Sequence, residues 1–249
     1  RRQRRQRRPR WWKVKRRSDG ILWYVVGKSR SGKSAFVNYI LKLYKRVLIL
    51  DPKADFARRP DYIRCDTKQQ LFQAISENFT GNAKIAYTEY SREALDYFSK
   101  MAFAWLKAAP CAIITDEIGG ITTAAQAVGG WAKLLMQGLG YGAHIYALVQ
   151  RGQDGDKTMR ANRTFSHICA HEPEEVDYCA KAMGIPAAEV PIMPEKEGKP
   201  FGFLQVRSGR IIQRGTLDIV GKKDHQRVRY RTAGKGQRVL KVAANGCLI

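Results

Sequence analysis

A glycine-rich run at residues 27–34, with the sequence GKSRSGKS, constrains the fold of this chain more than any other feature. It follows an apolar run at residues 21–26 and precedes a helix-like stretch at residues 35–44. Two glycines let the backbone curl until successive N–H groups point at one anion, and the following helix adds the positive end of its dipole. The run therefore predicts a phosphate-binding loop between a strand and a helix.

Every residue of this loop is a candidate nucleotide-binding residue: Gly27, Lys28, Ser29, Arg30, Ser31, Gly32, Lys33 and Ser34. Lys33 is placed to reach the outer phosphates of ATP, and the Ser34 hydroxyl to bind Mg2+. The competing interpretation is a glycine-rich turn that binds no ligand.

A second pattern, AIITDE at residues 112–117, ends an apolar strand with two acids. Asp116 is predicted to hold the magnesium ion and Glu117 to orient or deprotonate the attacking water. Gln150 follows the next predicted strand. In sheets where that strand lies between the strand before the phosphate loop and the strand before the acid pair, its carboxyl end meets the γ-phosphate. Lys33, Glu117 and Gln150 are therefore the predicted catalytic residues of ATP hydrolysis, although Gln150 also reads as an ordinary residue at a strand end.

Short apolar runs alternate with helical patterns along the chain, which is typical of a parallel sheet with crossover helices. The predicted strands are residues 22–26, 46–50, 112–115, 144–149 and 166–170. Helices are predicted around residues 95–105 and at residues 174–183. Residues 200–206 and 211–216, joined by Ser208-Gly209, predict a β-hairpin. We therefore expect an α/β fold with a C-terminal β-hairpin.

The formal net charge of +23 is concentrated at the two ends of the chain. Residues 1–17 carry eleven basic and no acidic residues, and residues 221–249 carry eight basic residues and one acid, which leaves +5 for residues 18–220. Such ends are expected to contact a polyanion or an anionic surface. The chain is expected to divide into a basic arm at residues 1–20, an ATPase core at 21–190, a hairpin extension at 191–220 and an extended basic arm at 221–249.

The five cysteines form no CxxC pair, so we expect reduced thiols as in a cytosolic protein. His167, Cys169 and His171 alternate and would share one face of a strand. A fourth ligand at suitable spacing is missing, which favours buried packing over a zinc site.

No segment of the sequence favours a membrane protein. The N-terminal arginines are not followed by the apolar stretch that a signal peptide needs. Residues 118–150 are almost uncharged but contain seven glycines and a lysine, which favours a buried crossover helix and strand over a membrane span. We expect a soluble protein.

Several motifs together resemble those of the HerA and FtsK superfamily of DNA-pumping ATPases. They are Asp51-Pro52-Lys53 after the second predicted strand, the Asp116-Glu117 pair, and LLMQG at residues 134–138, which leads through Gly142 to Gln150-Arg151. The similarity spans about residues 22–183. The stretch LGYG at residues 139–142 departs from it, because cellular relatives often carry an arginine there.

The resemblance implies a RecA-like P-loop ATPase core that forms a ring, usually a hexamer, and threads double-stranded DNA through a central channel. Family members commonly supply an arginine finger to the ATP of the neighbouring subunit. Arg163 and Arg160 are the candidates here, with Arg151 behind them. A compact motor with basic ends is similar to the genome-packaging ATPases of membrane-containing, tectivirus-like viruses, which implies a location at the packaging vertex of the virion and in the host cytoplasm.

Two questions stay open at the level of the sequence. The N-terminal arm, which includes Trp11 and Trp12, suits double-stranded DNA, a capsid vertex or portal protein, an anionic membrane surface, or no dedicated partner. The function could also be that of a DNA-transfer or phage-secretion ATPase, or of a non-hydrolysing, nucleotide-dependent DNA-binding or assembly protein. Glu117 argues against the last of these, because a binding module needs no acid that orients water.

Overall fold

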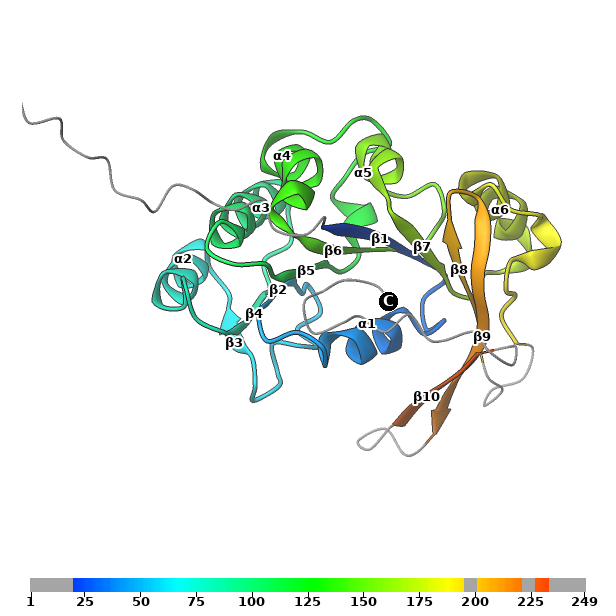
Figure 1. Cartoon of the computed structure of the whole chain (residues 1–249), viewed down its shortest axis with the longest axis horizontal. Coiled ribbons are helices and arrows are strands. Elements are labelled where there is room, and N and C mark those ends of the chain that lie inside the picture. Colours follow the sequence, from blue (N-terminus) through cyan, green and yellow to red (C-terminus); the bar gives the residue numbers. More distant parts are fainter. Residues whose placement is uncertain (1–19, 195–200, 221–226, 233–249) are drawn as a thin grey trace, which may run out of the picture.

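A computed structural model describes residues 20–194, 201–220 and 227–232. Within these ranges the chain forms one ten-stranded sheet in the order β10-β9-β8-β7-β1-β6-β5-β2-β4-β3 (Figure 1). Seven strands are parallel: β1 (Ile21–Val26), β2 (Val47–Leu50), β3 (Ile63–Cys65), β4 (Lys84–Tyr87), β5 (Ala112–Thr115), β6 (His144–Val149) and β7 (Phe165–Ile168). Three more continue the sheet in antiparallel pairs: β8 (Phe201–Arg207), β9 (Arg210–Val220) and β10 (Arg227–Thr232).

Helices cover both faces of the parallel strands, as Figure 1 shows. Helix α1 (Lys33–Leu41) packs on one face. On the other face lie α2 (Lys68–Glu77), α3 (Arg92–Leu106), α4 (Gly129–Gln137), α5 (Lys157–Asn162) and α6 (Val176–Met183). The β8–β9 hairpin curves around the edge of the sheet towards the side of α1.

The central strands are apolar because both of their faces are buried. On β1, Leu22 and Tyr24 point into the core shared with α3 and α4, whereas Trp23 and Val25 point into the core shared with α1. A parallel strand that is covered on both sides has no solvent face, so its sequence is a continuous apolar run instead of an alternating one.

The α/β fold and its C-terminal hairpin are confirmed. All five predicted strands are present, and those at residues 112–115 and 144–149 have the predicted bounds. The first helix begins at Lys33, two residues earlier than predicted, and the helix predicted at residues 174–183 is a short 3-10 turn followed by α6. The predicted hairpin is formed by β8 and β9.

Two parts of the prediction are corrected. No element was assigned between residues 51 and 91, and β3, α2 and β4 lie there. Residues 227–232, expected to belong to an extended arm, form β10 against β9. The rest of the two basic arms, residues 1–19, 221–226 and 233–249, lies outside the described residues. In the part that the structure describes, no helix has the length and apolarity needed to cross a membrane.

Candidate nucleotide-binding site

The phosphate loop connects β1 to α1, as the sequence predicts. Gly27 and Gly32 hold φ angles of 153° and 102°, a region that side chains rarely adopt. A Cβ atom on Gly27 would also lie 2.6 Å from the Cβ atom of Cys169, so the backbone comes closer to β7 than any other residue type allows. The loop is thus shaped by two positions that require glycine.

Lys33, the first residue of α1, turns its side chain back over the loop. Its ammonium group donates hydrogen bonds to the carbonyl oxygens of Gly27 and Lys28. Burial lowers the pKa of Lys33, and the nearby acids Asp116 and Glu117 oppose that shift. A buried ammonium group held by neutral carbonyls is a strong binding group for an anion that enters the loop.

Asp116 and Glu117 follow directly after β5 and have different surroundings. Asp116 is buried, and this burial, reinforced by the adjacent Glu117 carboxylate, raises the pKa of Asp116 to about 6. Glu117 has a φ angle of 53°, unusual for a residue with a side chain. Its carbonyl oxygen accepts a 2.6 Å hydrogen bond from the hydroxyl group of Tyr90, which helps to hold this backbone conformation.

The Glu117 carboxylate is held by two partners from neighbouring strand ends. Its Oε1 atom accepts hydrogen bonds from the Lys53 ammonium and, at 3.0 Å, from Nε2 of Gln150. The ion pair with Glu117 raises the pKa of Lys53. The structure therefore joins the predicted base Glu117 to the predicted sensor Gln150.

Sequence reasoning did not assign Lys53 to the site. Lys53 lies in the turn after β2, and the buried Asp51 carboxylate organises this turn by accepting hydrogen bonds from the backbone N–H groups of Asp55, Phe56 and Ala57 at 2.8–3.0 Å. The available signal was the position of the Asp51-Pro52-Lys53 motif after an apolar strand, since parallel strands end at one edge of a sheet.

The strand order explains why these residues meet. β6 lies between β1 and β5, so Gln150 ends between the phosphate loop and the acid pair. A cavity of about 620 Å³ lies at this edge and is lined by Ser29, Arg30, Gly32, Lys33, Ser34, Ala35, Asn38, Lys53, Asp55, Asp116 and Glu117. Its walls carry both cationic and carboxylate side chains.

The donors in this cavity fit a magnesium ion. The Ser34 hydroxyl and the Asp116 carboxylate line the same space, and hydroxyl and carboxylate oxygens are ligands that Mg2+ prefers. Asp116 also lacks a hydrogen-bonded cationic partner among the described residues, whereas Glu117 pairs with Lys53. Five of the eight predicted nucleotide-binding residues and both predicted metal ligands thus line one cavity.

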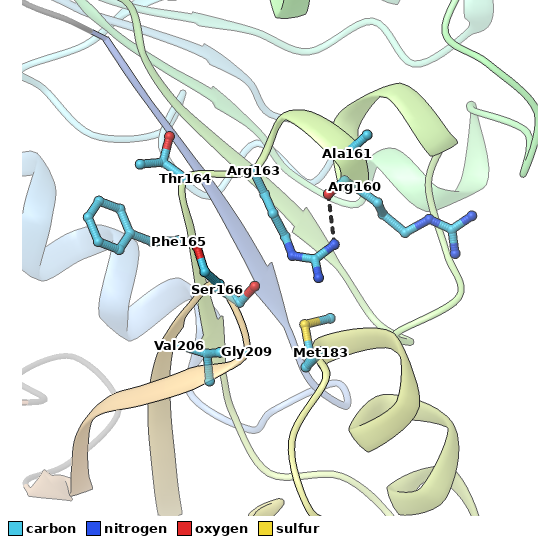
Figure 2. A pocket seen from close by; sticks show the side chains of 10 residues that line it. Arg160, Ala161, Arg163, Thr164, Phe165, Ser166, Met183, Val206 and Gly209 are labelled. Atoms are coloured by element: carbon cyan, nitrogen blue, oxygen red, sulfur yellow. Dashed lines mark hydrogen bonds between the residues drawn. The ribbon is translucent and has the colours of Figure 1, made fainter.

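The three candidate arginine fingers lie in different places. Arg151 follows Gln150 and pairs with Glu175 at 2.8 Å. Arg163 lies two residues before β7, whose amino end is at the opposite edge of the sheet from the phosphate loop. Arg160 lies in α5, its guanidinium donates to the carbonyl oxygen of Gln153 at 3.4 Å, and Figure 2 shows its side chain diverging from that of Arg163. The Arg163 guanidinium donates to the carbonyl oxygens of Arg160 and Ala182 at 2.7 and 3.0 Å.

The alternating histidines and cysteine are packed in the core, as expected. His167 stacks on Phe36 with ring centroids 3.7 Å apart, and Nδ1 of His171 is 2.8 Å from the carbonyl oxygen of Cys169. In the part of the chain described by the structure, no three histidine, cysteine, aspartate or glutamate side chains are grouped so that they could hold a metal ion together.

Comparisons with known proteins agree with this architecture. The chain is 31% identical over 138 residues to Protein P9 of Pseudoalteromonas phage PM2, a match that covers 54% of this chain and 62% of P9. The genome-packaging NTPase B204 of Sulfolobus turreted icosahedral virus 2, in complex with AMPPCP, superimposes with a TM-score of 0.58 at 15% identity, covering 77% of this chain and 95% of B204. The fold is that of a P-loop ATPase core.

A second B204 structure, the DNA-packaging ATPase from Sulfolobus turreted icosahedral virus, gives a TM-score of 0.52 at 16% identity over 79% of this chain and 96% of that one. No protein-family model matches the chain. The resemblance predicted from the motifs is thus confirmed at the level of the fold, and the match to P9 spans less than two thirds of the length of that relative.

Proposed function

We propose that this chain is an ATP-driven motor that translocates double-stranded DNA and packages a viral genome into a preformed capsid. The observation that carries this proposal is that Lys33, Asp116 and Glu117 line one cavity, while Gln150, at the end of the intervening strand, donates a hydrogen bond to Glu117. A site that only binds nucleotide needs the phosphate loop but not a carboxylate that is oriented by two partners.

The proposed chemistry assigns one role to each side chain. Lys33 neutralises the outer phosphates, and the backbone N–H groups of the loop hold them in place. Glu117 accepts a proton from the water whose oxygen attacks the γ-phosphorus, and the electron pair of the breaking P–O bond leaves with ADP. Lys53 and Gln150 orient the Glu117 carboxylate for that transfer.

Ser34 and Asp116 would hold Mg2+ in this site. When bound, the ion would neutralise charge on the β- and γ-phosphate oxygens. The position of Asp116 beside Glu117 then separates two tasks, because one carboxylate serves the metal and the other remains available for the water.

The translocation part of the proposal has support of other kinds. The named function of B204, whose fold this chain shares, is genome packaging. The net charge of +23 favours a polyanionic partner such as double-stranded DNA. We also propose a ring of identical subunits, a hexamer by the resemblance, in which an arginine of one subunit contacts the ATP of the next. Arg151, which pairs with Glu175 but keeps 60% of its side chain exposed, is our candidate for that arginine.

The test is steady-state ATP hydrolysis at low salt, with and without linear double-stranded DNA. Lys33→Ala serves as the blank, because it removes the buried cation of the loop and should weaken both nucleotide binding and turnover. We expect strong stimulation by duplex DNA in the wild-type chain. Turnover that duplex leaves unchanged would refute the motor, and an absence of turnover in both conditions would favour a nucleotide-gated binding protein.

A further inference from the structure

A second cavity lies at the opposite edge of the sheet from the phosphate loop. β7 runs parallel to β1 with Phe165 beside Trp23 and Ile168 beside Val26, and the phosphate loop follows Val26. The cavity, of about 350 Å³, surrounds the start of β7 and is lined by Arg163 and Ser166. It therefore belongs to neither the nucleotide nor the metal site of its own chain.

A tight turn closes one side of this cavity. Ser208 and Gly209 connect β8 to β9 with φ angles of 49° and 71°, the left-handed pair that a two-residue hairpin turn requires. The turn packs against the end of α6, because a Cβ atom on Gly209 would lie 3.2 Å from the carbonyl oxygen of Gly184. This wall is held by backbone contacts and does not depend on a flexible side chain.

Arg163 is fixed in the cavity. Its two hydrogen bonds to the carbonyl oxygens of Arg160 and Ala182 orient the guanidinium group, which Figure 2 shows extending into the space between Ser166 and Met183. A guanidinium group has five N–H donors in a planar fork, so these two bonds leave donors for a ligand. The fork matches the geometry of a phosphate group.

The surroundings of the cavity are cationic without compensation. None of its lining side chains is acidic, and the two arginines that line it are Arg163 and Arg160, whose side chain extends away from Arg163 in Figure 2. Arg207 and Arg210 flank the turn outside the lining, and the guanidinium of Arg207 lies 5.4 Å from the ring centroid of Phe165, which packs in the core on the α1 side. Among the described residues, neither Arg163 nor Arg160 takes part in an ion pair. Unpaired guanidinium groups around a polar cavity favour an anion as its ligand.

We propose that this cavity binds one phosphate group of the DNA backbone. The choice of DNA rests on the proposed function, while the phosphate chemistry rests on the cavity alone. The ATP of a neighbouring subunit also presents phosphate groups, but an arginine finger must extend out of its own subunit to reach that ATP. Arg163 is instead bonded to two carbonyl oxygens of its own chain.

The experiment measures binding of a short fluorescent DNA duplex to the full chain by anisotropy, without nucleotide, over a series of salt concentrations. Each lost phosphate contact should reduce the slope of log K against log salt by about 0.9. We expect this reduction, together with weaker binding, for Arg160→Gln and for Arg163→Gln. Arg58→Gln, which removes one exposed charge from the loop after β2, is the matched control and should keep the wild-type slope.

Thermal melting separates a lost contact from lost folding. Arg163→Gln removes two bonds that hold the backbone, whereas Arg160→Gln removes one 3.4 Å bond to the carbonyl oxygen of Gln153 and should fold normally. Slopes for folded Arg160→Gln that equal those of the wild type and of Arg58→Gln would overturn the proposal.

Two further outcomes distinguish the sources of phosphate and the two proposals. If inorganic phosphate raised the melting temperature of the wild type but not of Arg160→Gln, and the duplex slopes were unchanged, the cavity would bind free phosphate and the DNA assignment would be wrong. If ATP hydrolysis were not stimulated by duplex while the salt slope depended on Arg160, the motor would be refuted and this DNA contact would stand.

Discussion

Replacing Glu117 by glutamine should separate ATP binding from ATP hydrolysis. The amide retains the shape of the side chain but cannot take a proton from water. Loss of a general base typically costs 10²–10⁴ in rate, which corresponds to about 3–5 kcal/mol in the activation barrier. The change also removes an ion pair whose partners, Lys53 and Glu117, are 49% and 25% exposed. Pairs of this exposure contribute about 0–1 kcal/mol, so the free energy of unfolding should fall by less than about 1 kcal/mol.

The assay compares steady-state phosphate release with equilibrium binding of a fluorescent ATP analogue and with urea unfolding. Glu189→Gln is the control, because Glu189 pairs with Arg214, whose side chain is 50% exposed, and it lies outside the nucleotide cavity. We expect wild-type turnover for the control and strongly reduced turnover with preserved analogue binding for Glu117→Gln. Hydrolysis by Glu117→Gln at the wild-type rate would show that Glu117 is not the base.

Three other substitutions test the structure around the site. Gly32→Ala places a side chain on a residue with a φ angle of 102° and puts its Cβ atom 2.6 Å from Cδ2 of Leu217. The free energy of unfolding, measured by urea titration, should therefore fall by about 1–3 kcal/mol. The double variant with Leu217→Ala should not regain stability, because the backbone strain remains. Arg46→Met removes a buried guanidinium that donates to four backbone carbonyls and stacks 4.0 Å from the ring centroid of Trp105, which should cost about 1–3 kcal/mol and lower the melting temperature. Burial lowers the pKa of His167 to about 3, whereas a histidine in the unfolded chain has a pKa of about 6.5. The unfolded chain therefore takes up this proton at a higher pH than the folded chain, and the free energy of unfolding falls as the pH drops below about 6.5, by up to about 1.4 kcal/mol per pH unit. His167→Phe should reduce this pH dependence in urea unfolding.

The central strands were predictable because burial on both faces leaves a continuous apolar run. The runs at residues 112–115 and 144–149 match β5 and β6 residue for residue. β3 and β4 have three and four residues, too few for a pattern to stand out, and two of the three residues of β3 are exposed. α2 did carry a readable signal, since Thr67 and Gln70 form a reciprocal capping box at its start.

The site was predictable wherever a motif follows directly on a strand. The loop, Asp116, Glu117 and Gln150 meet because parallel strands end at one edge, and strand order places β6 between the other two. The partnership of Lys53 with Glu117 was not predictable in this way. It depends on the turn that Asp51 holds through three backbone hydrogen bonds and on the left-handed conformation of Glu117, neither of which has a sequence pattern of its own.

The β8–β9 hairpin is the element that lies against both cavities. Its turn, Ser208-Gly209, forms a wall of the cavity at the amino ends of the parallel strands, while Leu217, further along β9, packs against Gly32 of the phosphate loop at their carboxyl ends. The hydrogen-bonded strands β8 and β9 thus connect the turn at the second cavity to the contact between Leu217 and the phosphate loop. Because any coupling between two binding sites is reciprocal, a hairpin through which nucleotide in the loop changed the affinity of the turn for phosphate would let phosphate change the nucleotide affinity by the same factor.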